Sequence, residues 1–194
     1  MTLLDPLSAA LQPWQNFYML TAAAAATLTG LMFIAVTFGE SLVTKETTST
    51  ARAFLDPIFM HFVQVLFVGC LLTIPTLTHA VLGAVLVTLG GFRLVSLRWV
   101  FQRYIAAQRK AGDIEVSDWL TGIVLPILLH GLLIASGIGF LRREGASLTG
   151  LAVTSLGVLL LGIYSAWELL VWMAMVVTDR RESNAAERRG PEGE

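Results

Sequence analysis

Charged residues divide the chain into long apolar stretches. Four stretches contain no Asp, Glu, Lys or Arg, at residues 7–39, 57–92, 119–141 and 145–167. Each is long enough for a membrane helix, which needs roughly 20 apolar residues. The 57–92 stretch would form a helix of about 54 Å, which is too long for one crossing. Because "TIPTLTH" (73–79) places Pro75 and polar residues at its middle, we interpret this stretch as two helices joined by a tight turn.

The pattern therefore predicts an all-α integral membrane bundle of five transmembrane helices. The expected spans are 15–38, 57–75, 78–101, 119–141 and 149–178, all within a single domain, 1–178. Asp56 and Pro57 have the form of a helix N-cap and first helical residue. Residues 179–194 hold five acids and four arginines, and we expect them to form a disordered cytoplasmic tail. The composition agrees, since 55% of the 194 residues are hydrophobic and 14% are charged, against about 25% charged in soluble domains.

Basic residues are distributed unevenly between the two sides of the predicted bundle. Nine Lys and Arg residues lie in the 39–56 and 102–118 segments and the tail, whereas the other side has only Arg142 and Arg143. Because cytoplasmic loops carry the excess of basic residues, we expect the N-terminus outside and the C-terminus in the cytoplasm. The basic residues near the inner boundary suit contact with anionic lipid headgroups of the bilayer, and no nucleic acid partner is expected.

Several polar side chains fall inside the predicted spans. Ionisable groups are costly in a bilayer and usually face a partner, the bundle interior or a cavity. Glu168, within "YSAWELLVWMAM" (164–175), and Arg93 are expected at similar depths in the cytoplasmic half, where a guanidinium and a carboxylate can pair. Such a pair fixes helix register or acts as a gate, and the remaining alternative is a snorkelling Arg93 with a protonated Glu168.

Other polar residues are expected to join this pair. His61 and Gln64 share one helical face, and so do Tyr164, Ser165 and Glu168. The sequence thus predicts an intramembrane polar cluster that lines a vestibule open to the cytoplasm, made of Glu168, Arg93, His61, Gln64, Tyr164 and Ser165. The alternative is that Ser and Thr hydroxyls bond their own helices and that His61 is satisfied by a neighbour.

Two further helices carry candidate residues. Thr29, Thr37 and Glu40 follow one stripe of the first helix and are candidates for a pore lining or its mouth. In the fourth span Pro126 is expected to kink the helix, and His130, four residues later, to act as a hydrogen-bonded packing element.

No motif in the chain indicates an enzyme, a cofactor or a metal site. GxSxG, a P-loop and a cysteine pair are all missing. A metal set of His61, His130 and Glu168, or haem ligation by the two histidines, remains as an alternative without a spacing motif. We therefore expect neither catalysis nor a cofactor.

Small residues at four-residue spacing occur in three of the predicted spans. They are Ala22, Ala26 and Gly30, then Gly131, Ala135 and Gly139, and finally Gly162 and Ala166. Such stripes let helices approach closely in lipid, either within one bundle or between subunits. Because five helices are few to enclose a solute path, we expect a homo-oligomer built through these faces.

The first helix, "PWQNFYMLTAAAAATLTGLMFIAVTF" (13–38), resembles that of a family of small uncharacterised bacterial integral membrane proteins. In that family an aromatic entry, "W..FY.L", leads to "LTGL.F.AV". The resemblance implies a multi-pass protein of the bacterial inner membrane and carries over no activity.

These observations predict a homo-oligomeric inner-membrane protein that forms a permeation path or cytoplasm-facing vestibule for an ion or small solute. The alternative of equal weight is a non-transporting adaptor that regulates another membrane protein. An intramembrane enzyme or redox carrier is a lesser alternative.

Overall fold

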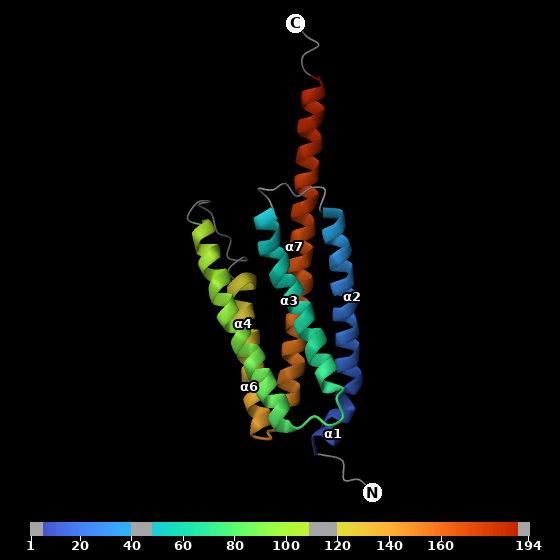
Figure 1. The fold of residues 1–194 in the computed structure, drawn as a ribbon, viewed down its shortest axis with the longest axis vertical. Coiled ribbons are helices and arrows are strands. Elements are labelled where there is room, and N and C mark those ends of the chain that lie inside the picture. Colours follow the sequence, from blue (N-terminus) through green and yellow to red (C-terminus); the bar gives the residue numbers. More distant parts are fainter. Residues whose placement is uncertain (1–5, 40–47, 109–119, 190–194) are drawn as a thin grey trace.

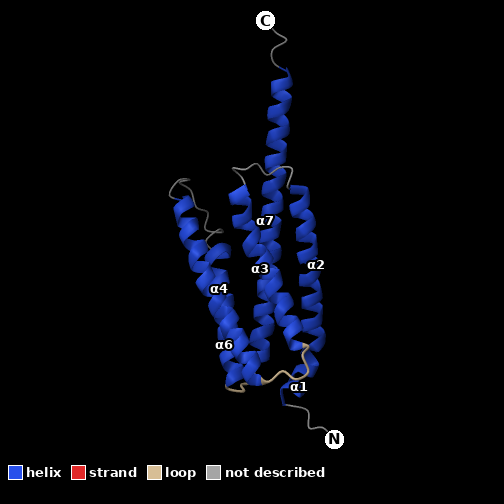
Figure 2. Cartoon of the chain, in the orientation of Figure 1, coloured by secondary structure: helices blue, strands red, loops and turns tan. Residues whose placement is uncertain are grey.

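The computed structural model describes residues 6–39, 48–108 and 120–189, and all the secondary structure in these ranges is helical (Figures 1 and 2). Five long helices, α2, α3, α4, α6 and α7, follow a short N-terminal pair, α1 and the 3-10 helix η1. A π-helical segment, η3, leads directly into α6. The bounds are α1 Pro6–Leu11, η1 Gln12–Trp14, α2 Gln15–Gly39, α3 Thr48–Leu72, α4 His79–Gln108, η3 Leu120–Val124, α6 Leu125–Leu141 and α7 Ser147–Arg189.

The five predicted transmembrane helices are confirmed. Five helices are long and apolar enough to cross a membrane, over Leu7–Thr37, Leu55–Leu72, His79–Arg98, Leu120–Leu141 and Ser147–Met175. The predicted turn between the second and third helices is also present, since α3 ends at Leu72 and α4 begins at His79. The chain therefore has the architecture of a multi-pass membrane protein.

Two predicted helix limits are wrong. Pro57 does not begin a helix, because α3 already begins at Thr48 and holds Pro57 in its interior. The segment expected to be a disordered tail continues α7 as a helix to Arg189. At 1.5 Å per residue α7 is about 65 Å long, roughly twice the thickness of a bilayer core. It therefore projects well beyond the other helices, as Figure 1 shows.

The long helices run alternately up and down and form two antiparallel pairs (Figure 1). α2 packs along α3, α4 packs along α6, and α7 joins the pairs by packing against both α3 and α6. One end of the bundle carries α1 and the 73–78 turn and is called the α1 end here. At the opposite end α2 finishes, α3 begins and α7 projects.

Glycines hold the α4–α6 pair together. A Cβ added to Gly83 would lie 2.6 Å from the Gly137 carbonyl oxygen, and one added to Gly137 would lie 3.0 Å from the Gly83 carbonyl oxygen. One heptad along α4, a Cβ on Gly90 would lie 2.6 Å from Cγ1 of Ile134 and 3.2 Å from the His130 carbonyl oxygen. The two backbones thus touch along a seam defined by Gly83, Gly90 and Gly137. Close backbone approach is how small residues stabilise helix pairs in lipid.

The small-residue stripes expected from the sequence divide into two groups. Ala22 packs against Gly69 of α3, Gly139 against Ser147, and Gly162 against Phe62. In contrast, Ala26, Gly30, Gly131 and Ala135 are exposed on the outside of the bundle. The buried members serve packing within the chain, and the exposed members are left for lipid or for another subunit.

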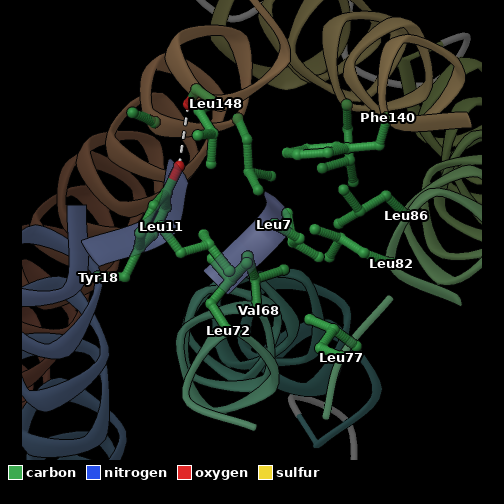
Figure 3. Close-up of a cluster of buried hydrophobic side chains, with 13 residues drawn as sticks. Leu7, Leu11, Tyr18, Val68, Leu72, Leu77, Leu82, Leu86, Phe140 and Leu148 are labelled. Atoms are coloured by element: carbon green, nitrogen blue, oxygen red, sulfur yellow. Dashed lines mark hydrogen bonds between the residues drawn. The ribbon is translucent and has the colours of Figure 1, made fainter. Parts of the chain in front are cut away.

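The α1 end is closed by an apolar cluster, shown in Figure 3. Leu7 of α1 lies in the middle of it, with labelled side chains of α3, α4 and α7 around it. Leu7 is fully buried, and the Tyr18 hydroxyl fixes α2 to α7 by donating to the Leu148 carbonyl at 2.9 Å. The sequence analysis missed α1, because six residues between polar flanks lack the length that marks a membrane helix. This short helix acts as an apolar plug at the end of the bundle.

We predict that Gly83→Ala lowers the free energy of unfolding by about 1 to 3 kcal/mol, because the new methyl group overlaps the Gly137 carbonyl. Gly131→Ala is the matched control, since nothing lies within 4 Å of its added Cβ. Unfolding of the purified protein in detergent, followed by circular dichroism, measures both variants. Equal stability of the two variants would contradict the close α4–α6 seam.

We also predict that Tyr18→Phe costs about 1 kcal/mol, because it leaves the buried Leu148 carbonyl without its side-chain donor. Thr37→Val is the control, because that exposed hydroxyl bonds only the Phe33 carbonyl of its own helix. The same unfolding measurement applies, and a Tyr18→Phe variant as stable as the control would argue against the α2–α7 hydrogen bond.

Candidate functional site

The imidazole of His130 lies at the junction of three helices. Its Nε2 atom is 3.0 Å from Oε1 of Gln64 on α3 and 3.4 Å from Nε of Arg93 on α4. Its Nδ1 atom is 2.6 Å from the Pro126 carbonyl oxygen, one turn earlier on α6. His130 and Gln64 are buried and Arg93 is half-buried. Both ring nitrogens of His130 are therefore engaged within the protein.

The Pro126 carbonyl fixes the proton on the His130 ring. A carbonyl oxygen only accepts, so Nδ1 must carry the hydrogen, and Nε2 of a neutral ring is then an acceptor. Arg93 suits this acceptor because its Nε–H donates to it. Because Nε2 of a neutral ring has one lone pair, it accepts either from Arg93 or from a Gln64 amide turned to present its NH2 group, and not from both at once. A doubly protonated ring would donate to Oε1 instead, but would place a second positive charge beside the guanidinium.

The glycine seam brings Arg93 within reach of His130. Gly90 precedes Arg93 by three residues on the same helical face and touches the His130 carbonyl region of α6. A larger residue at that position would push the two helices apart by the width of a side chain. The close crossing therefore sets the length of the Arg93–His130 contact.

His61 completes the cluster from α3. Its ring centroid is 6.5 Å from that of His130, and its side chain is only 6% exposed. Gly162 of α7 permits this burial, because an added Cβ there would lie 3.3 Å from Cβ of His61. The Nδ1 atom of His61 is fully buried and has no hydrogen-bond partner among the described residues. A buried polar atom without a partner is unfavourable, so Nδ1 of His61 is available to hydrogen-bond a group that is not part of the described residues.

The predicted ion pair between Arg93 and Glu168 is not formed. Between described residues the structure has one salt bridge, Arg142–Glu144, near the α1 end. Gly162 of α7 lies level with Phe62 of α3, and the two helices are antiparallel. Glu168 lies six residues from that level toward the end opposite α1, and Gln64 lies two residues from it toward the α1 end. At 1.5 Å per residue the two positions are about 12 Å apart along the bundle. Glu168 is also exposed. The sequence places the two charges at similar depths, but the stagger of α7 separates them.

The other predicted site residues that the structure describes lie on α2 and α7. Tyr164 is exposed and Ser165 is half-buried on α7. Thr29 and Thr37 donate to the Ala25 and Phe33 carbonyls of their own helix, at 2.7 and 2.9 Å, as the alternative interpretation held. Glu40 lies outside the described residues. Of the residues expected together, His61, Gln64 and Arg93 are close to one another, and His130, which was expected as a hydrogen-bonded packing element, lies among them.

The irregularity expected at Pro126 takes the form of a π-helical turn. Residues Leu120–Val124 are π-helical and Pro126 lies in the first turn of α6. A proline donates no backbone hydrogen bond, which favours such a change of helix type. Among the described residues no three His, Cys, Asp or Glu side chains gather as a metal site would require, and both nitrogens of His130 have partners within the protein.

Apolar packing surrounds the polar cluster. The α1-end cluster, from Leu7 to Ala152, lies on one side. A second apolar cluster contains Ile58, Phe62 and Val65 of α3 with Leu129 of α6 and Leu161 of α7. The fold and site thus define a multi-pass α-helical membrane protein with one cationic side chain held in a buried polar cluster. Comparison with protein families, curated proteins and solved structures found no match.

We predict that Gln64→Leu destabilises the protein by about 1 to 3 kcal/mol, because the buried His130 ring loses its nearest side-chain partner. Glu168→Gln should change stability by less than about 0.5 kcal/mol, because its side chain is exposed. Thermal unfolding in detergent distinguishes the two variants. A costly Glu168→Gln with a neutral Gln64→Leu would restore the ion-pair hypothesis.

Proposed function

We propose that this protein is a homo-oligomeric inner-membrane protein with a vestibule for an ion or small solute, at whose base lie Arg93, His130, Gln64 and His61. One observation carries the proposal. The Arg93 guanidinium lies within a membrane span, and it donates a hydrogen bond to Nε2 of the neutral His130 ring and not to an acidic side chain among the described residues. Ionisable groups at such positions mark ion and substrate pathways more often than they mark simple packing.

The apolar plug favours a vestibule over an open pore through one chain. Leu7, Leu82 and Leu86 are fully buried between the helices at the α1 end. A second apolar cluster, which includes Ile58 and Phe62, packs around the site as well. In the proposed vestibule an ion reaches the site from the end opposite α1 past these side chains, and complete passage requires movement of α1.

The orientation and the assembly follow from charge and exposed small residues. Nine basic residues on the side where α7 projects, against two on the α1 side, favour a vestibule that faces the cytoplasm. The exposed faces of Ala26 and Gly30 on α2, and of Gly131 and Ala135 on α6, suit close contact with a second subunit.

The projecting part of α7 supports the alternative function. Residues 176–189 continue the helix for about 20 Å beyond the apolar span, and their sequence is rich in Arg and acidic residues. A charged helix that stands clear of the bundle is suited to contact another protein, as an adaptor would. The two functions are separated by whether the protein itself moves an ion.

We predict that wild-type protein in liposomes conducts small ions and that Arg93→Gln reduces the flux at least tenfold, because the cationic group at the base of the vestibule is lost. Glu168→Gln, which is exposed and outside the cluster, should retain the wild-type rate. Ion-selective dyes inside the liposomes measure the flux.

Absence of flux in well-folded wild-type oligomers would overturn the proposed path and favour the adaptor. Flux that Arg93→Gln and Glu168→Gln reduce equally would dissociate conduction from the cluster.

A further inference from the structure

The charge of the buried cluster is unbalanced. The Arg93 guanidinium stays protonated in proteins, and with neutral imidazoles the four side chains carry a net charge of +1. The described acidic side chains do not compensate for this charge: Glu144 pairs with Arg142 near the α1 end, and Asp56 and Glu168 are exposed. Arg93 is half-buried within a membrane span, and a cation without an acidic partner at such a position is unfavourable, so an anion would balance the charge of the site.

The hydrogen-bonding groups that remain are suited to an anion. Arg93 uses Nε for His130, and its terminal N–H groups have no recorded partner within the described ranges. Nδ1 of His61 is buried and likewise unpartnered. In the tautomer that carries hydrogen on Nδ1, His61 is a neutral donor. Charge-assisted N–H donors with no competing acceptor form the usual environment of a bound anion in a protein interior.

We propose that Arg93 and His61 bind a small monovalent anion such as chloride, which enters from the end of the bundle opposite α1. This inference rests on the proposed vestibule and names what it holds. One negative charge balances the cluster, whereas a divalent anion would leave it with an excess of one. The close helix packing around Gly90 and Gly162 favours a small anion over a bulky one.

Two features define the route by which the anion reaches the cluster: the apolar plug at the α1 end and the positions of the N–H donors. Leu7 and its neighbours separate the cluster from the α1 end. Arg93 lies five residues before Arg98, the last residue of its span, toward the end of the bundle from which α7 projects in Figure 1. The anion therefore approaches along α4, where the side chains of Arg93 and Arg98 provide positive charge.

Binding is tested on the full-length protein in detergent. Sodium gluconate is exchanged for sodium chloride at constant ionic strength, and binding is followed by titration calorimetry and by the midpoint of thermal unfolding. We expect saturable heat and a midpoint that rises with chloride, because a ligand that binds only the folded state stabilises it. Wild-type protein that shows neither response would overturn the proposal.

Variants assign the binding to the site. Arg93→Gln should weaken chloride binding at least tenfold, Arg93→Lys less, and His61→Phe should weaken it without removing the charge. Glu168→Gln is the control and should bind as wild type. If Arg93→Gln does not fold, the wild-type titration and the His61→Phe variant test the assignment in its place. Chloride binding that is unchanged in a folded variant of either residue would overturn the assignment.

A lipid phosphate is the other source of negative charge, and a separate arm tests it. Phosphatidylglycerol that stabilises the delipidated protein, with no competing effect of chloride, would overturn the proposal in favour of a headgroup. Chloride binding without ion flux would refute only the proposed path. Flux without chloride binding would refute only the present inference.

Discussion

The hydrogen bond between His130 and the Pro126 carbonyl determines which hydrogen bonds the His130 ring can form with its other neighbours. Because that carbonyl only accepts, a neutral ring presents one acceptor, Nε2, and both Gln64 of α3 and Arg93 of α4 lie within hydrogen-bond distance of it. α3 packs mainly against α2 and α7, and α4 mainly against α6. The side chains on His130 thus form a polar connection between the two helix pairs.

The glycine seam is the condition for this connection. A hydrogen bond of 3 to 3.5 Å requires helix axes held to within a fraction of an ångström, and apolar packing in lipid supplies no strong directional force. Because Gly83, Gly90 and Gly137 have no side chains, the backbones of α4 and α6 are in direct contact at these positions and the distance between the two helices is fixed. Backbone contact then positions Arg93, so a purely steric feature of α4 and α6 determines an electrostatic one. The same relation holds on the other side, where Gly162 allows α7 to cover His61.

The sequence predicts the helices well and their mutual arrangement poorly, for a physical reason. Apolar length and turn residues determine where a span begins and ends, and these are local properties, so the five helices were expected correctly. The depth of a residue in the membrane also follows mainly from its position along its own helix, which is why His61, Gln64 and Arg93 were expected at the same level. Which side of a helix faces which neighbour depends on packing that a single sequence does not show. Glu168 was therefore paired with Arg93, although the stagger of α7 at Gly162 carries it away. His130 was expected to be hydrogen-bonded, but its partners on α3 and α4 were not foreseen.

The position of the plug relative to the cluster limits how such a protein works. Leu7 belongs to a helix of six residues, and its contacts with α3, α4 and α7 are apolar and without direction. The Tyr18–Leu148 hydrogen bond lies next to it and is the directional restraint on that end of α2. Withdrawal of α1 would expose leucines of α4 without breaking any hydrogen bond of the His130 cluster. The closed end and the polar cluster are thus held by separate contacts, apolar packing around Leu7 and hydrogen bonds around His130.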